Sequence, residues 1–366
     1  MKKKTEHFKG TKELKGVSNQ ETTNKNAVEK LKKKRQIKRT VDELFKGIVD
    51  GDTTALSQGI TLIESTKHED RVLANTLIDR CLNHPTPQSV RVGITGVPGV
   101  GKSTFIEALG QYLVKQNCKI AVLAIDPSSS KSKGSILGDK TRMNELSVHP
   151  KAFIRPSSSS GSLGGVTHHS RESIILCEAA GFDTIIVETV GVGQSEIEVK
   201  EMTDFFLLLM LAGAGDELQG IKRGIMEMAD GMLINKADGE NLLNAKRAKR
   251  EYQNALHLFP AAESGSSPKV EICSALQAFH LEKAWSLIEN YLNITQQNGY
   301  FEKQRQGQLK AWFNKSIQEQ VNVRLFGNTA VKEKISLLEQ QVEQRNISPT
   351  EAAEQVFEEF LRTLPR

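Results

Sequence analysis

The sequence has few cysteines and no long hydrophobic run, and both absences limit what the protein can be. Its four cysteines, Cys81, Cys118, Cys177 and Cys273, lie far apart, without the close pair that a zinc knuckle or a redox motif requires. The longest apolar run, FFLLLMLA (residues 205–212), is too short to cross a bilayer. We therefore expect core thiols in a reducing compartment and no membrane partner.

The lysine-rich start lacks the apolar segment of a secretion signal, and its acidic residues argue against an organelle transit peptide, so we expect a cytoplasmic protein. The formal net charge is only +5, and much of it lies in the first 40 residues, including KLKKKRQIKR (residues 30–39). Because no aromatic residues surround this run to stack on bases, a solvated helix face is the favoured interpretation and no nucleic-acid partner is expected.

The order of patterns along the 366 residues predicts one central domain with helical extensions at both ends. Apolar residues recur at helical spacing over residues 26–82, and NHPTPQS (residues 83–89) then interrupts the pattern. The expected parts are an N-terminal helical arm (1–85, its first 25 or so residues flexible), a central domain (86–295) and a C-terminal helical extension (296–366). In the extension, Val331, Ile335, Leu338 and Val342 form an apolar stripe.

The central part alternates short apolar runs with segments of helical length. Such alternation predicts an α/β fold with a mainly parallel sheet covered by helices on both faces, in which ligands bind at the carboxyl ends of the strands. The expected strands are VRVGIT (90–95), KIAVLAID (119–126), TIIVET (184–189), FFLLLML (205–211), GMLIN (231–235) and KVEIC (269–273).

A phosphate-binding loop follows the first of these strands. GVPGVGKST matches the pattern G-x-x-x-x-G-K-[ST] between a strand and a helix, the setting that the pattern requires. Its glycines let backbone N–H groups converge on phosphate oxygens, Lys102 supplies a cation that stabilises the terminal phosphates, and Ser103 offers a hydroxyl to Mg²⁺. The predicted nucleotide-binding residues here are Gly96, Val97, Pro98, Gly99, Val100, Gly101, Lys102, Ser103 and Thr104.

Two further elements indicate which base is bound. NKAD, with Asn235, Lys236 and Asp238, follows a strand. A carboxylate can accept hydrogen bonds from both the N1–H and the exocyclic amine of guanine, whereas adenine offers the wrong donor pattern at the same edge. The softer match CSAL, with Ser274, Ala275 and Leu276, follows the last expected strand, where GTPases often contact the base through backbone groups. The pattern favours GTP over ATP.

Acidic residues at strand ends are the candidates for a magnesium site. Glu188 ends an expected strand three residues before Gly191, so its carboxylate and a flexible amide would both lie near the terminal phosphate. Asp126 ends another strand, and Asp139 lies in a Gly/Ser/Lys-rich stretch that could order around the ion and phosphate as a switch loop. We expect Lys102, Glu188 and Gly191 to serve catalysis and Ser103, Asp126, Asp139 and Glu188 to hold Mg²⁺.

Other residues are weaker candidates. The adjacent His168 and His169 would point in different directions on a helix and are not expected to share a metal. Arg142, Arg155 and Arg171 could each stabilise charge in the transition state, and the sequence does not choose among them.

The sequence of these segments resembles that of one family, the GTPases associated with methylmalonyl-CoA mutase. Its members are known as MeaB-type cobalamin chaperones and are also labelled ArgK or lysine/arginine/ornithine transport ATPases. The resemblance covers most of residues 90–239, in order. It rests on GITGVPGVGKST, VLAIDPSSSKSKGSILGDKTRM, AFIRPSSSSGSLGGVT, LCEAAGFDTIIVETVGVGQSE, TDFFLLLMLAGAGDELQGIKRGI and INKADG. The first 25 residues, LFPAAESGSSPKV and the C-terminal tail do not match residue by residue.

The resemblance implies a P-loop GTPase domain of the SIMIBI class, in which Glu188 is the family's Walker B acid and Asp126 and Asp139 complete the magnesium site. It also implies that the segment after Glu188 forms a second switch, that residues 213–224 form a third switch that communicates with the mutase, and that the C-terminal helices join a homodimer. Members of the family gate the loading of adenosylcobalamin and protect or reactivate the mutase. We expect any contact of this chain with cobalamin itself to be indirect.

Three alternatives remain beside a mutase chaperone: a metal-insertion GTPase for another metalloenzyme, an ATP-dependent kinase of a transport protein, and a dimeric scaffold that binds GTP without useful hydrolysis. Metal-insertion proteins usually display Cys or His clusters, which the sequence lacks. NKAD speaks against the kinase, and the magnesium carboxylates speak against the scaffold.

Overall fold

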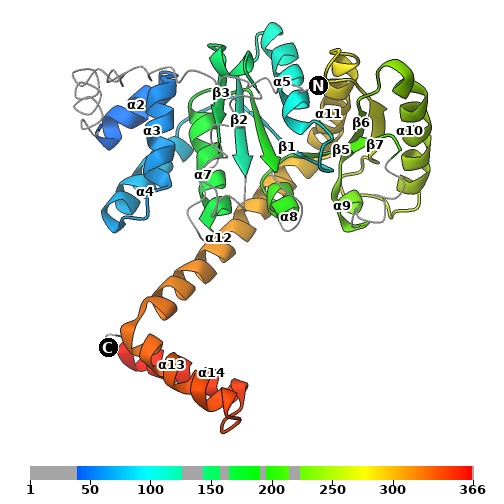
Figure 1. Cartoon of the computed structure of the whole chain (residues 1–366). Helices are drawn as coiled ribbons and strands as arrows, with labels where there is room; N and C mark the ends of the chain where they lie inside the picture. Colours follow the sequence, from blue (N-terminus) through cyan, green and yellow to red (C-terminus); the bar gives the residue numbers. More distant parts are fainter. Residues whose placement is uncertain (1–38, 126–142, 157–164, 190–194, 214–222, 365–366) are drawn as a thin grey trace, which may run out of the picture.

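The computed structural model describes residues 39–125, 143–156, 165–189, 195–213 and 223–364. Figure 1 shows a central sheet covered by helices, a small group of N-terminal helices at one side, and a long helix that carries a helical hairpin away from the sheet. Within the described residues, no helix has both the length and the apolar character needed to span a membrane. The part of the N-terminal helical pattern before residue 39 lies outside them. The expected domain boundaries stay predictions.

The described residues form a seven-stranded parallel sheet in the order β3-β2-β4-β1-β5-β6-β7. This confirms the predicted α/β class with a mainly parallel sheet. The strands are β1 (Val90–Gly96), β2 (Ile120–Ile125), β3 (Ala152–Arg155), β4 (Thr184–Thr189), β5 (Phe205–Leu211), β6 (Gly231–Asn235) and β7 (Lys269–Ile272).

The sequence missed one strand, β3. It has only four residues at the edge of the sheet, two of them half-buried, and it pairs with β2 alone. A strand this short presents no alternation or apolar run that distinguishes it from a loop, so only its pairing reveals it.

Alternate residues of the strands face two separate apolar cores. In β2, Ile120 and Val122 pack on one side of the sheet, whereas Ala121, Leu123 and Ile125 pack on the other. The first core includes α5 (Lys102–Lys115), α10 (Leu242–Leu256) and α11 (Leu281–Gln297). The second includes α7 (Gly165–Ala179), α8 (Ser195–Lys200) and the N-terminal helices α2 (Val41–Val49), α3 (Thr53–Ile63) and α4 (His68–Leu82).

The N-terminal helices begin at well-formed caps. Thr40 and Glu43 form a reciprocal capping box at the start of α2, and Asp52 caps α3 by accepting from the amide of Thr54. Leu56, Ile60 and Ile63 of the predicted helical pattern are buried on α3 in the second core, where α3 packs against α2, α4 and α7. The helical prediction for this part of the chain is confirmed.

The C-terminal extension consists of α12 (Tyr300–Gly327), α13 (Thr329–Glu343) and α14 (Pro349–Thr363). Figure 1 shows α12 running away from the sheet and the α13–α14 hairpin at its far end. Val331 and Leu338 of the predicted stripe are buried in α13, which packs against α14. Much of α12 remains exposed, including the apolar side chains of Leu309, Phe313 and Ile317.

A half-buried ion pair joins the start of β1 to the end of α7. Arg91 donates two hydrogen bonds of 2.8 Å to Glu178, which also accepts from the Ser89 hydroxyl. Burial by itself raises the pKa of the Glu178 carboxyl, but Arg91, Ser89 and Arg305 outweigh burial and lower that pKa below its usual value. The pair therefore stabilises the fold in its charged form.

We predict that Glu178→Ala lowers the free energy of unfolding by about 2 kcal/mol, because the half-buried Arg91 loses two charge-assisted hydrogen bonds. Since the folded-state pKa is depressed, the stabilisation is present above the unfolded-state pKa of about 4.3 and is lost as the pH falls through the lower folded-state value. Urea unfolding of both proteins at several pH values measures this. The matched control is Glu358→Ala, which removes an exposed pair with Arg362 and is expected to change stability by less than about 1 kcal/mol. Equal stability of wild type and Glu178→Ala at neutral pH would contradict the prediction.

Candidate nucleotide site

The predicted phosphate loop connects β1 to the N-terminus of α5. Gly96 has to be glycine because a Cβ there would lie 2.5 Å from the backbone oxygen of Leu209 in β5. Gly99 and Gly101 have φ angles of +74° and +87°, in the left-handed region that favours glycine. The loop thereby turns back on itself and leads into α5, whose first N–H groups are suited to bind an anion.

Lys102 lies at the first position of α5, beside two carboxylates. Its ammonium donates to the backbone oxygen of Gly96 at 3.0 Å. Burial lowers the pKa of Lys102, and the carboxylates of Glu188 and Glu196 partly offset that effect. A negatively charged ligand at the loop would compete with these carboxylates for the same cation.

Ser103 and Glu188 meet at the carboxyl ends of the strands. Glu188 in β4 lies next to Ile94 of β1 and Ala124 of β2 and is only 3% exposed. The Ser103 hydroxyl lies 3.3 Å from its Oε1 atom. Two oxygen donors side by side next to a phosphate loop fit Mg²⁺, which takes one or two protein ligands and completes its shell with waters and phosphates.

Asn235 connects the phosphate loop to the segment after β7 that is expected to contact the base. Its Nδ2 donates to the backbone oxygen of Val100 at 2.8 Å, and its Oδ1 accepts from the backbone N–H of Ala275 at 3.1 Å. The side chain is 1% exposed, so both hydrogen bonds are protected from water. It holds together three segments that are far apart in the sequence.

The neighbouring residues of NKAD complete the link. Lys236 donates from Nζ to the backbone oxygen of Gly99 at 2.8 Å, and the Ser274 hydroxyl donates to Oδ2 of Asp238. Ala275 is buried and Leu276 is 83% exposed. The serine thus orients the carboxylate that is expected to select guanine.

The structure brings together most of the predicted residues, and three lie outside the part of the chain that it describes: Asp126, Asp139 and Gly191. Sequence reasoning missed Glu196, which is 1% exposed on α8 and acts on the charge of Lys102. Its only signal was an acidic residue at the end of the glycine-rich stretch GVGQSE.

The arginine and histidine candidates have other contacts. Arg155 forms an ion pair with Glu64 of α3 at 2.6 Å. Arg171 bonds to Glu201 and to the backbone oxygen of Gln308, whereas Arg142 lies outside the described residues. His169 contacts Glu172, and no cluster of three or more His, Cys, Asp or Glu suited to a metal occurs within the described ranges.

We predict that Asn235→Ala weakens nucleotide binding by about tenfold to a hundredfold, because two buried hydrogen bonds worth about 1 kcal/mol or more each are lost. Titration with a fluorescent guanine nucleotide measures the affinity. Asn244→Ala, at an exposed position of α10, is the matched control and is expected to bind like wild type. Wild-type affinity in Asn235→Ala would show that the link between phosphate loop and base elements is dispensable.

Comparisons with known proteins agree with this arrangement. The family model described as "Methylmalonyl Co-A mutase-associated GTPase MeaB" matches residues 56–330. The chain is 45% identical over 289 residues to the GTPase ArgK of Escherichia coli K12, a match that covers 79% of this chain and 87% of the relative. It is 43% identical over 349 residues to the mouse "Methylmalonic aciduria type A homolog, mitochondrial", covering 93% of this chain and 84% of the relative.

A solved structure extends the agreement to the fold. The crystal structure of an LAO/AO transport system kinase is 36% identical in sequence and superposes with a TM-score of 0.70, over 88% of this chain and 98% of that one. With a P-loop, a parallel sheet and relatives that are themselves named GTPases, the chain is a nucleotide-binding GTPase and belongs to the MeaB family.

Proposed function

We propose that the protein hydrolyses GTP with Mg²⁺ and uses the nucleotide as a switch to assist a cobalamin-dependent acyl-CoA mutase. The observation that carries the chemistry is the pairing of Ser103 with Glu188 beside Lys102. The choice of the mutase as the partner enzyme, or client, rests on the description of the matching family and on the name of the mouse relative. The expected cytoplasmic location stays a prediction.

In this proposal Ser103 and Glu188 hold Mg²⁺, together with Asp126 and Asp139 from outside the described residues. The ion, when bound, would neutralise charge on the two terminal phosphates. Lys102 and the loop amides stabilise the charge that develops as the terminal phosphoryl group leaves. Glu188 is also proposed to orient the attacking water, and Gly191 to supply a nearby amide.

Base selection is assigned to Asp238, which the Ser274 hydroxyl orients. The carboxylate accepts from the N1–H and the exocyclic amine of guanine, and adenine offers no such pair of donors. Lys236 is fixed to Gly99, so its aliphatic stem lies along the edge of the phosphate loop and can cover one face of the base.

The client is proposed to gate hydrolysis. A switch of this kind turns over slowly by itself and faster when the partner completes or stabilises the active arrangement. By this proposal the bound nucleotide sets the affinity for the mutase, and loading, protection or reactivation of its adenosylcobalamin follows. The solved relative is named a transport system kinase, so an ATP-dependent activity is the competing function.

Phosphate release from GTP and from ATP, with and without a cobalamin-dependent acyl-CoA mutase, tests the proposal. We expect turnover with GTP only, stimulation by the mutase, and loss of activity without Mg²⁺. In Asp238→Asn, the amide replaces an acceptor by a donor, so GTP turnover should fall and xanthosine triphosphate, with a carbonyl where guanine has an amine, should become the better substrate. Asp79→Asn, the same change at an exposed position of α4, is the matched control.

Equal use of ATP by the wild type would remove the function assigned to Asp238 and favour the kinase. GTP-selective turnover that ignores the mutase would keep the GTPase and point to another client, such as a metalloenzyme that receives its metal from a GTPase.

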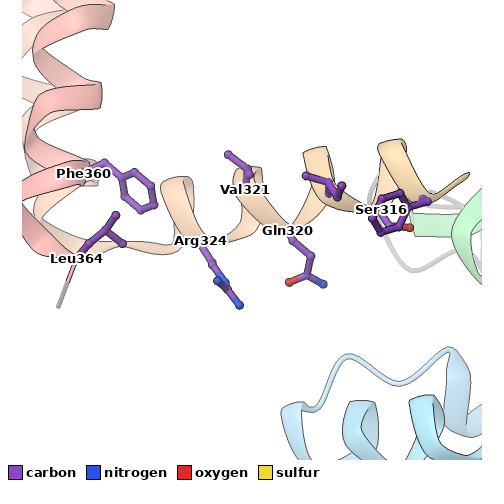
Figure 2. A pocket seen from close by; sticks show the side chains of 8 residues that line it. Ser316, Gln320, Val321, Arg324, Phe360 and Leu364 are labelled. Atoms are coloured by element: carbon purple, nitrogen blue, oxygen red, sulfur yellow. The ribbon is translucent and has the colours of Figure 1, made fainter. Parts of the chain in front are cut away.

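We further propose a homodimer joined through the C-terminal helices. An apolar groove of about 510 Å³ lies between α12 and the end of α14, and Figure 2 shows side chains that line it, among them Val321 and Phe360. Its lining side chains are largely exposed apolar groups, among them Phe313 at 66%, Ile317 at 47% and Val321 at 45%. An apolar surface of this kind on a helix that projects from the domain fits a second copy of the same arm.

Sedimentation velocity tests the dimer. We expect the wild type to sediment as a dimer at micromolar concentration and Phe313→Glu to sediment as a monomer, because the substitution places a charge in the apolar groove. Leu258→Glu, which changes an apolar side chain that is 84% exposed outside the groove, is the control and should remain dimeric. A monomeric wild type, or a dimeric Phe313→Glu protein, would refute the arm as the interface.

A further inference from the structure

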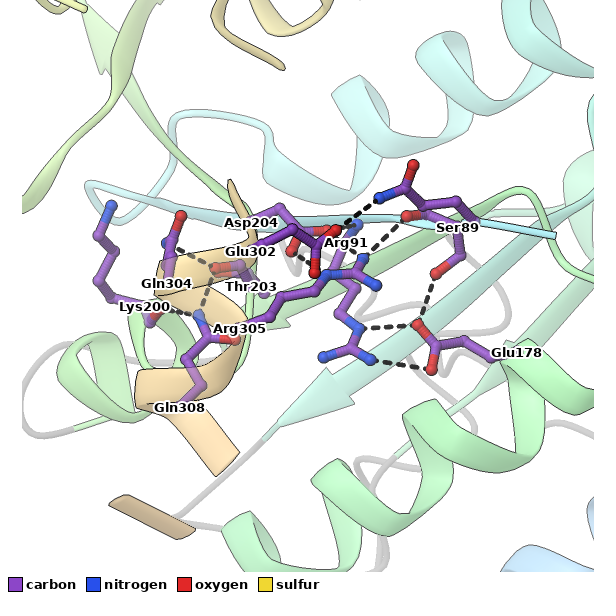
Figure 3. Close-up of polar contacts among 11 residues, drawn as sticks. Ser89, Arg91, Glu178, Lys200, Thr203, Asp204, Glu302, Gln304, Arg305 and Gln308 are labelled. Atoms are coloured by element: carbon purple, nitrogen blue, oxygen red, sulfur yellow. Dashed lines mark hydrogen bonds and ion pairs between the residues drawn. The ribbon is translucent and has the colours of Figure 1, made fainter. Parts of the chain in front are cut away.

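The C-terminal arm, which consists of α12 and the α13–α14 hairpin, is anchored at its base to the buried carboxylate of Asp204. Arg305 of α12 donates to both carboxylate oxygens of Asp204, at 2.8 and 2.7 Å, and to the backbone oxygen of Ser89 at 2.8 Å (Figure 3). Asp204 is 1% exposed, and the Arg305 guanidinium lies 4.5 Å from the centre of the buried Phe301 ring. Because such a pair cannot separate without leaving a buried charge, this end of α12 is a fixed point.

The next turn of α12 contacts the chain that connects α8 to β5. Gln304 and Gln308 donate to the backbone oxygen of Thr203, at 3.2 and 2.8 Å, and Gln308 also approaches that of Lys200 (Figure 3). The arm is thus bonded to the end of α8 through backbone groups.

Further from the fixed point, the contacts are single and partly exposed. Lys315 forms an ion pair of 2.9 Å with Glu198 of α8, with side chains that are 34% and 25% exposed. A partly exposed pair of this kind contributes little to stability, so its removal leaves the fold intact.

The packing at this junction leaves room for movement. A cavity of about 240 Å³ lies between α4, α7 and α12, and its lining includes Ile174, Met202, Leu309 and Trp312. A solidly packed interface would hold α12 at one angle, whereas an unfilled one permits small rotations about its anchored end.

The short helix α8 faces the nucleotide site on one side and the arm on the other. Glu196 is buried and acts on the charge of Lys102, whereas Glu198 pairs with Lys315. Two positions along a helix correspond to a rotation of about 200°, so the two carboxylates point in nearly opposite directions. Val199 of α8 packs directly against Gly93 of β1, the strand that leads into the phosphate loop. A terminal phosphate that attracts Lys102 therefore gives the two nucleotide states different interactions with α8.

We propose that α8 couples the nucleotide site to the C-terminal arm, with the Glu198–Lys315 pair transmitting the position of α8 to α12 as it pivots about Arg305. The inference rests on the proposed GTP site and does not depend on the mutase. Lys315 is about 15 Å along the helix from Arg305 and Gly327 is about 33 Å from it, so a displacement of about 1 Å at the ion pair becomes about 2 Å at the end of α12. The arm, and a second copy bound to it, would then adopt different angles in the two nucleotide states.

Hydrogen exchange of the full-length protein tests the coupling, with GDP and with a non-hydrolysable GTP analogue in the presence of Mg²⁺. In the wild type we expect exchange to differ between the two nucleotides in α8 and in residues 304–320 of α12. In Lys315→Ala, the difference in α8 is retained and the difference in α12 is lost. The double variant Glu198→Lys with Lys315→Glu, which rebuilds the pair with reversed charges, restores the α12 difference.

Lys310→Ala, at an exposed position of α12, is the matched control and keeps the wild-type response. Nucleotide affinities measured in parallel separate the possible failures. If both nucleotides bind and α12 does not respond in the wild type, or still responds in Lys315→Ala, the coupling through this pair is wrong and the GTP site stands. If GTP does not bind, the proposed function fails and the coupling falls with it.

Discussion

The parallel orientation of all seven strands is the constraint on which the site depends. Because parallel strands end at the same edge, the segments that follow β1, β4, β6 and β7 meet there although they are separated by up to about 180 residues of sequence. Asn235 connects two of these segments by bonding to Val100 and Ala275, and Ser103 connects a third by contacting Glu188. The common direction of the strands brings these segments together, and the individual side chains can act on one ligand only because of it.

At the opposite end of the sheet, where β1 and β5 begin, ion pairs connect the strands to helices. The half-buried pair of Arg91 with Glu178 and the pair of Arg305 with the buried Asp204 lie where β1 and β5 begin, and an unpaired carboxylate at Asp204 would be costly. The two ion pairs hold α7 and α12 in position relative to the sheet. The arm therefore leaves the domain in a direction set by electrostatics at its base, while its exposed length remains available for contacts with other molecules.

Apolar runs were sufficient to predict the fold class because a strand buried on both faces has few alternatives. Six of the seven strands were visible in this way, and the phosphate loop was recognisable because backbone geometry restricts its glycines. The strand and the acidic residue that were not predicted from the sequence were missed for the same reason. Strand β3 exists through its pairing with β2, and Glu196 acts through its proximity to Lys102, so neither has a local signature. Arg155 and Arg171 were candidates for charge stabilisation in sequence, but contacts with Glu64 and Glu201 occupy both.

The sequence by itself determined that the protein binds a nucleotide, because a P-loop after a buried strand is a local pattern, and it led to the proposals of Mg²⁺ at the acidic strand end and guanine at NKAD. It also determined that the C-terminal segment is helical, because helical spacing is a local property. Only the tertiary structure decided that Asn235 holds the loop to the base elements, that Glu196 and Glu198 lie on opposite sides of α8, and that Arg305 anchors the arm. These depend on distances between residues far apart in the chain, and such distances are set by packing and strand order, which no local pattern contains.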